Sequence, residues 1–171
     1  MGGIYMKSLT INGEEVQVKL DYNFYNRLIE HTKNKDKSEV DGFNKLIAGL
    51  VDQDPDAIIT FYQSAVVGKK RPTRADVEKA LTNAGVWDEE DPFGEVYKEL
   101  QGVGFLKLKI NHLLHTIKED IQTSKAALEV TEEANDNSKD SKAEVKEAKN
   151  TVALAKKRYE LTKKFLEQLG K

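Results

Sequence analysis

Apolar and polar residues alternate along residues 8–20, on either side of the dipeptide Asn12-Gly13. Asn-Gly readily adopts the positive backbone dihedrals of a tight turn between antiparallel strands. The pattern therefore predicts a β-hairpin. Because a two-stranded hairpin is not stable alone in water, we expect the following segments to cover its apolar face. The alternating apolar positions are Leu9, Ile11, Val16, Val18 and Leu20.

Between residues 21 and 101 the apolar positions recur every three or four residues, which is the spacing of amphipathic helices. This spacing predicts about four or five short helices packed against the hairpin. Asp21 is placed to cap the first helix, and a polar break over residues 33–39 separates it from the second. The apolar positions of these two helices are Phe24, Leu28, Ile29, Phe43, Leu46, Ile47 and Leu50.

Three prolines mark where later helices are expected to begin. Pro55, Pro72 and Pro92 are each assigned to the first helical position, because the amide that proline lacks has no partner there. Thr73 and Asp76 add a capping-box-like pair beside the second of these prolines.

The stretch VDQDPDA, which begins at residue 51, spaces three aspartates like the first ligands of a calcium loop. The positions that such a loop needs for glycine and for a bidentate glutamate hold Ala57 and Gln63. We therefore predict no calcium site, and we assign Asp54 as the cap of a helix that runs from Pro55 to about Val67.

A basic cluster follows this helix. Gly68 is expected in the left-handed conformation that ends many helices, which places Lys69, Lys70 and Arg71 near the negative end of the helix dipole. The same cluster has a second interpretation as a contact for an acidic partner, such as residues 87–91 (WDEED) of another copy. The glycine spacing of a phosphate loop is missing.

Beyond Gly104 the apolar residues step by three or four as far as residue 128, which predicts one long helix. Residues 132–142 form a polar break, and the chain is expected to resume as a helix at Ala143. Two arrangements fit this last helix: an antiparallel hairpin with the preceding helix, or docking on another subunit. Its apolar seam consists of Val145, Ala148, Val152, Ala155, Tyr159, Thr162, Leu166 and Leu169.

These patterns predict a mainly α (α+β) fold, in which an N-terminal β-hairpin packs on a small bundle of short helices and two long helices follow. Residues 6–102 are expected to form the first domain, and residues 103–171 a long helical extension with its break at 132–142. The first five residues continue neither pattern, so Met6 is a candidate natural start.

Few residues point to catalysis or metal binding. His112 and His115 lie three residues apart on the predicted long helix, but the chain has no cysteine and no third ligand placed to complete a site. No nucleophile motif is present, so we predict no catalytic, metal or cofactor site. Trp87 is expected to form a local apolar cluster with Phe93 and Tyr97, or to anchor a partner protein.

The charge balance bears on the class of partner. The 171 residues carry 27 Lys and Arg against 29 Asp and Glu, a formal net charge of −2. This lacks the positive field that attracts nucleic acid, although residues 55–85 can be imagined as a helix-turn-helix. No apolar stretch approaches the roughly 20 residues that cross a bilayer, and no signal peptide is recognisable. We expect a cytosolic protein with neither nucleic-acid nor membrane partners.

The order of these pieces resembles the tail assembly chaperones of long-tailed (siphovirus-type) phages and prophages of Gram-positive bacteria. The resemblance covers roughly residues 7–101. It rests on three stretches: LTINGEEVQVKLDYNFYNRL, GFNKLIAGLVDQDPDAIITFYQSAVVGKKRPTRADVEKAL and GEVYKEL.

The resemblance implies a non-catalytic chaperone that self-associates, coats and solubilises the tape measure protein and helps to recruit tail tube subunits. It implies a location in the cytoplasm of the bacterial host and absence from the mature virion. It also implies a frameshifted longer product that contacts the tail tube protein, and Gly170-Lys171 is compatible with a slippery codon pair.

The alternative is a structural or adaptor protein that dimerises through its C-terminal helices. In either case the candidate residues for self-association or partner contact are Val145, Val152, Tyr159, Leu166, Leu169, Lys69, Lys70, Arg71 and Trp87.

Overall fold

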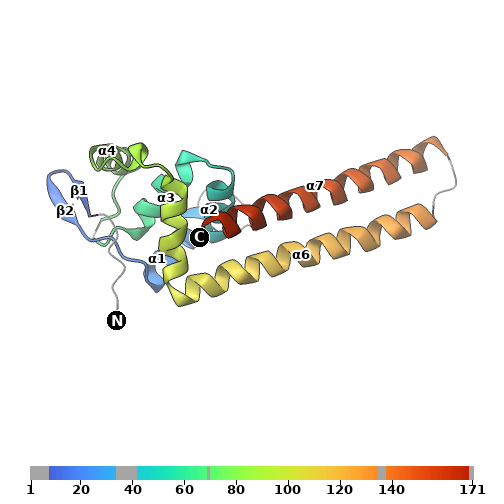
Figure 1. Ribbon diagram of the computed structural model, residues 1–171, viewed down its shortest axis with the longest axis horizontal. Coiled ribbons are helices and arrows are strands. Elements are labelled where there is room, and N and C mark those ends of the chain that lie inside the picture. Colours follow the sequence, from blue (N-terminus) through green and yellow to red (C-terminus); the bar gives the residue numbers. More distant parts are fainter. Residues whose placement is uncertain (1–7, 34–41, 69, 135–137, 170–171) are drawn as a thin grey trace. The chain divides into compact units, whose positions relative to one another are not determined.

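The computed structural model describes residues 8–33, 42–68, 70–134 and 138–169 (Figure 1). Contacts divide the chain into two compact units, Met1–Lys107 and Leu108–Lys171. The elements are β1 (Leu9–Ile11), β2 (Glu14–Val16), α1 (Tyr22–Lys33), α2 (Gly42–Val51), α3 (Pro55–Ala65), α4 (Arg74–Asn83), the 3-10 helix η1 (Val86–Asp88), α5 (Pro92–Gly102), α6 (Gly104–Glu133) and α7 (Lys139–Leu169).

The predicted fold class is confirmed: the chain is mainly helical, with an N-terminal β-hairpin and two long C-terminal helices. Helix α6 begins in the first unit and continues into the second. The predicted polar break at 33–39 lies, apart from Lys33, outside the described residues.

The hairpin has the predicted turn. Strands β1 and β2 are antiparallel, with Leu9 opposite Val16. Asn12 (φ 53°) and Gly13 (φ 84°) both take positive dihedrals, as a two-residue primed turn requires. Leu9 and Ile11 are buried, and α4 packs against β1, so the apolar face of the hairpin is covered by a helix.

The segment that follows β2 pairs with the end of α3. The amide of Lys19 donates to the carbonyl oxygen of Ala65, and the amide of Val67 donates to that of Gln17, both at 2.9 Å. The chain therefore leaves α3 in an extended conformation, with Val66 as the C-cap. This corrects two predictions: α3 ends at Ala65 rather than near Val67, and Gly68 does not have a positive φ.

Side-chain caps begin several helices as predicted. Asp21 Oδ1 accepts from the amide of Phe24 at 3.0 Å, and Asp54 Oδ1 accepts from the amide of Asp56 at 3.0 Å. Asp91 caps α5 in the same way. These carboxylates satisfy amides that have no partner within the helix.

One proline prediction is wrong. Pro55 and Pro92 begin α3 and α5, but α4 begins at Arg74. The reason is that Thr73 is the N-cap of α4, in a complete capping box with Asp76, which leaves Pro72 outside the helix. The Pro72 carbonyl oxygen instead accepts a hydrogen bond from Gln63 Nε2 at 2.8 Å.

The core of the first unit lies among α1 to α5 and the hairpin. Helices α2 and α3 approach closely: a Cβ added at Gly49 would lie 2.8 Å from the Cβ of Ala57. The largest fully buried side chains of the core are Tyr97, Phe24, Phe43, Phe61, Leu9, Leu28, Leu46, Ile47, Leu50, Ile58, Leu81 and Leu100.

The second unit is a helical hairpin. Helices α6 and α7 run antiparallel within the one chain (Figure 1), and Lys149 Nζ of α7 lies 2.8 Å from Glu132 Oε1 of α6. The break between the helices is shorter than predicted, since α6 continues to Glu133 and α7 begins at Lys139 rather than Ala143. The physical reason is Ser138, whose Oγ accepts from the amide of Ser141 at 3.1 Å and so caps α7 early.

Candidate interaction surfaces

The predicted apolar seam of α7 is the less exposed side of that helix. Val145, Val152 and Leu166 are at most 9% exposed, and Thr162 is 5% exposed. Tyr159 is half-buried, and the side chain of Leu169 lies outside what the structure describes. Because the seam is covered within one chain, its role in self-association stays a prediction.

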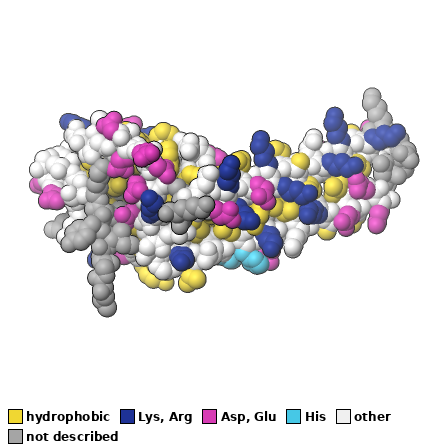
Figure 2. Space-filling view, in the orientation of Figure 1, with side chains coloured by type: hydrophobic (Ala, Val, Ile, Leu, Met, Phe, Trp, Pro, Cys, Tyr) yellow, Lys and Arg dark blue, Asp and Glu magenta, His cyan; other side chains and the backbone are white. Residues whose placement is uncertain are grey.

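A second set of apolar residues on α7 lies outside the seam that the sequence predicts. Leu154 is 68% exposed and Leu161 is 52% exposed. They are seven residues apart, so they lie on the same side of the helix, about 100° from the nearest seam positions. Figure 2 shows Lys and Arg side chains beside apolar ones along α6 and α7. In the sequence, these two leucines could have been found as large apolar residues that do not fit the steps of three and four of the seam.

The end of α3 gathers two arginines around a buried serine. Ser64 is fully buried, and Arg27 Nε of α1 donates to its carbonyl oxygen. Arg71 Nη2 donates to Ser64 Oγ at 3.2 Å. Arg27 Nη2 is buried and has no hydrogen-bond partner among the described residues. We call Arg27 and Arg71 the arginine pair.

The arginine pair is electrostatically unusual because its members repel each other. Partial burial, and then the charge of Arg27, lower the pKa of Arg71, while Glu30 acts in the opposite direction. Sequence reasoning found Arg71 but missed Arg27, since nothing in the sequence indicates that α1 passes the end of α3.

Three glutamates act electrostatically on Tyr62, which also lies near the end of α3. Burial, and then the charges of Glu89, Glu99 and Glu95, raise the pKa of Tyr62 from 10.0 to about 12. Burial and Glu95 also raise the pKa of Glu99, whose Oε2 is buried without a hydrogen-bond partner among the described residues. We call Glu89, Glu95 and Glu99 the glutamate group.

The raised pKa of Tyr62 predicts a loss of stability at high pH. The unfolded chain releases this proton near pH 10 and the folded chain near pH 12, so stability is complete below pH 10 and falls as the pH rises through this window. The full expected loss is about 2–3 kcal/mol above pH 12, and about half of it is reached at pH 11. Urea unfolding at pH 9 and pH 11 should show a smaller loss for Tyr62→Phe than for the natural chain. Tyr22→Phe is the control, because Tyr22 is exposed. Equal losses of stability in Tyr62→Phe and Tyr22→Phe would show that Tyr62 is not the source of the pH dependence.

The remaining predicted contact residues are dispersed. Trp87 is half-buried in η1, and its Nε1 donates to Thr82 Oγ1 at 3.2 Å. Lys70 is exposed, and Lys69 lies outside the described residues. The structure therefore brings Arg71 to the end of α3 and leaves the other predicted contacts as proposals.

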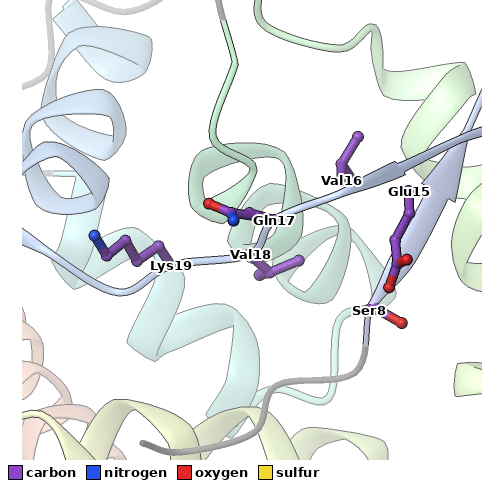
Figure 3. A pocket seen from close by; sticks show the side chains of 6 residues that line it. All are labelled: Ser8, Glu15, Val16, Gln17, Val18 and Lys19. Carbon is purple, nitrogen blue, oxygen red and sulfur yellow. The ribbon is translucent and has the colours of Figure 1, made fainter.

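A pocket of about 590 Å³ lies along β2 and the segment after it. In Figure 3 the labelled side chains are spread along β2 and the segment after it, with Ser8 just before β1, and they do not converge on one point. They offer a mixed polar and apolar surface without a set of groups arranged for proton transfer or nucleophilic attack. The lining residues are Ser8, Glu15, Val16, Gln17, Val18 and Lys19.

Metal-binding residues do not gather in the part of the chain that the structure describes. There, no group of three or more His, Cys, Asp or Glu side chains is placed to hold an ion. His115 instead lies 3.3 Å from Glu119 on the same helix. None of the described helices is both long enough and apolar enough to cross a membrane.

The fold and these surfaces define a small, mainly helical protein whose distinctive features are charged groups and apolar strips suited to contact with other proteins. The family model of the phage tail assembly chaperone protein, TAC, matches residues 8–115. The chain therefore belongs to the family of phage tail assembly chaperones. No curated protein and no solved structure matches it.

Proposed function

We propose that this chain is a non-catalytic assembly chaperone that self-associates, binds and solubilises the tape measure protein and helps to recruit tail tube subunits. The family match over residues 8–115 is the observation that carries the proposal. We further propose that it acts in the cytoplasm of the bacterial host, that it is absent from the mature virion, and that its source is a siphovirus-type phage or prophage of Gram-positive bacteria.

The surface of α7 supports a role in covering another helical protein. Leu154 and Leu161 are exposed on one side of the helix and are flanked by cationic side chains, including Lys157 and Arg158. An amphipathic partner helix can bury such apolar positions while its acidic residues meet the flanking charges. Several weak contacts of this kind, repeated along a long partner, give useful affinity and still permit displacement.

Coexpression with the tape measure protein tests the proposal. We expect the tape measure protein to be insoluble alone and to become soluble and copurify with this chain. The double variant Leu154→Ser/Leu161→Ser should weaken copurification, whereas the matched Lys146→Ser/Lys163→Ser variant should have a smaller effect. Equal solubility of the tape measure protein with and without the chain would remove the basis of the proposal.

Mass spectrometry of finished particles separates a chaperone from the structural or adaptor alternative. A chaperone is lost before assembly ends, so no peptides of this chain are expected in purified particles. Peptides of this chain in amounts comparable to those of the particle's structural proteins would favour an adaptor.

A further inference from the structure

A mainly apolar hollow lies between α2 and α3, and we call it the α2–α3 hollow. Its volume is about 170 Å³, and its lining includes the buried side chains of Leu28, Leu46 and Ala57. A cavity of about 150 Å³ is large enough to bind benzene, which is close to a leucine side chain in size. Because the hollow is open to the surface, it can accept one large apolar side chain from another protein.

The packing of the two helices fixes the hollow in place. Residues 52–54 join α2 to α3, and near this turn the helices meet at Gly49 and Ala57, where a side chain on Gly49 would have no room. From this contact the hollow extends to Gly42 on α2 and Thr60 on α3. The hollow is therefore formed before any partner arrives.

One side of α2 has the spacing that accepts a side chain from a packed helix. Gly42, Lys45, Leu46 and Gly49 occupy positions i, i+3, i+4 and i+7, so they lie on the same side of α2. When two helices pair, a side chain of one inserts among four residues of the other. All four of these residues line the hollow, which favours a helix as the occupant.

The end of the hollow near the turn is acidic. Asp52, Asp54 and Asp56 are exposed there. Arg74 pairs with Asp56, whereas Asp52 and Asp54 form no ion pair within the part of the chain that the structure describes. Asp54 lies beside Gly49, since its amide donates to the Gly49 carbonyl oxygen at 2.8 Å. A helix with a lysine or arginine about one turn from its apolar side chain therefore complements this surface.

We propose that the α2–α3 hollow binds an amphipathic helix of the tape measure protein. The helix inserts one leucine, isoleucine or methionine, and a lysine or arginine about one turn away meets the aspartates. The inference rests on the proposed function and adds a contact distinct from Leu154 and Leu161. The family match supports this placement, because residues 8–115 include the hollow and exclude α7. A binding site that the family shares must lie within the matched residues.

Overlapping peptides of the tape measure protein, titrated with the purified full chain and followed by fluorescence anisotropy, test the proposal. The peptides that bind should share the apolar and basic pattern, and alanine in place of the apolar residue should weaken binding about tenfold or more. Thr60→Phe should weaken binding by a similar factor, because Thr60 lines the hollow and the larger ring occupies it. Thr10→Phe, at an exposed position of β1, and Leu154→Ser/Leu161→Ser should bind like the natural chain.

A charge exchange tests the acidic end of the hollow. Asp52→Lys leaves the hollow and the cap of α3 in place, and it should weaken binding about two- to fivefold. A peptide whose basic residue is replaced by glutamate should recover affinity for this variant. Glu14→Lys makes the same charge change at an exposed position of β2 and should bind like the natural chain.

Three results would overturn the proposal: unchanged binding by the Thr60 variant, binding peptides without the pattern, or no binding peptide. If circular dichroism shows that Thr60→Phe does not fold, Thr60→Leu replaces it. Coexpression with the natural chain decides the proposed function separately. A tape measure protein that becomes soluble while Thr60→Phe binds peptides normally would remove this contact alone. Without solubilisation, the titration still reports whether the hollow binds such a helix.

Discussion

Val152→Asp is expected to destabilise the α6–α7 hairpin while the stability of the first unit is unchanged. Val152 is 6% exposed in the apolar seam, so the substitution places a carboxylate where water is largely excluded. Burying a charge without a partner is among the most destabilising single changes, and we expect a cost of about 2–4 kcal/mol. Leu154→Asp, two residues further on and 68% exposed, should change stability by less than about 0.5 kcal/mol.

The chain offers separate probes for its two units. Its one tryptophan, Trp87, lies in the first unit, so fluorescence reports the unfolding of that unit. Helices α6 and α7 contain 30 and 31 residues, so they contribute much of the helical circular dichroism. Val152→Asp should lower the circular dichroism midpoint and leave the fluorescence midpoint in place. Equal effects of Val152→Asp and Leu154→Asp would show that the register of the seam is wrong.

Phe61→Ala should produce the opposite result, a large loss of stability in the first unit. Phe61 is fully buried in α3, and its ring meets those of Phe24 at 5.6 Å and Tyr62 at 5.1 Å in edge-to-face geometry. Truncating a buried phenylalanine typically costs about 3–5 kcal/mol, because a cavity remains and the aromatic pairs are lost. That is a large part of the total stability of an ordinary domain, about 5–15 kcal/mol.

Tyr22→Ala is the matched control for this aromatic truncation. Tyr22 is 68% exposed and stacks on Phe105 with a centroid distance of 4.5 Å, so its loss should cost only about 0.5–1.5 kcal/mol. Urea unfolding followed by Trp87 fluorescence measures both variants. If Tyr22→Ala proves as damaging as Phe61→Ala, the core does not lie where the structure places it.

The sequence was sufficient to predict features that depend on neighbouring residues. The Asn12-Gly13 turn, the cap at Asp21 and the capping box of Thr73 and Asp76 follow from local backbone chemistry, and each is confirmed. The α7 seam was also predictable, because a period of three and four residues describes one side of a helix.

Features that depend on distant segments were not predictable in the same way. Gly68 was assigned as a helix end by local preference, but the hydrogen bonds of Gln17 and Lys19 extend the chain there instead. The arginine pair needs α1 to pass the end of α3, which no local pattern indicates. The sequence therefore indicated Arg71 as a candidate contact, but it did not indicate Arg27, whose charge lowers the pKa of Arg71.

The pairing of Val18 with Val66 also has a consequence for how the chain folds during synthesis. The two residues are 48 positions apart, so the segment after β2 lacks its neighbour until the whole of α3 has left the ribosome. Closing so long a loop costs conformational entropy, and contacts of this kind form slowly compared with single helices. We therefore expect the early helices to form first and the first unit to become protected from proteolysis only after this late pairing.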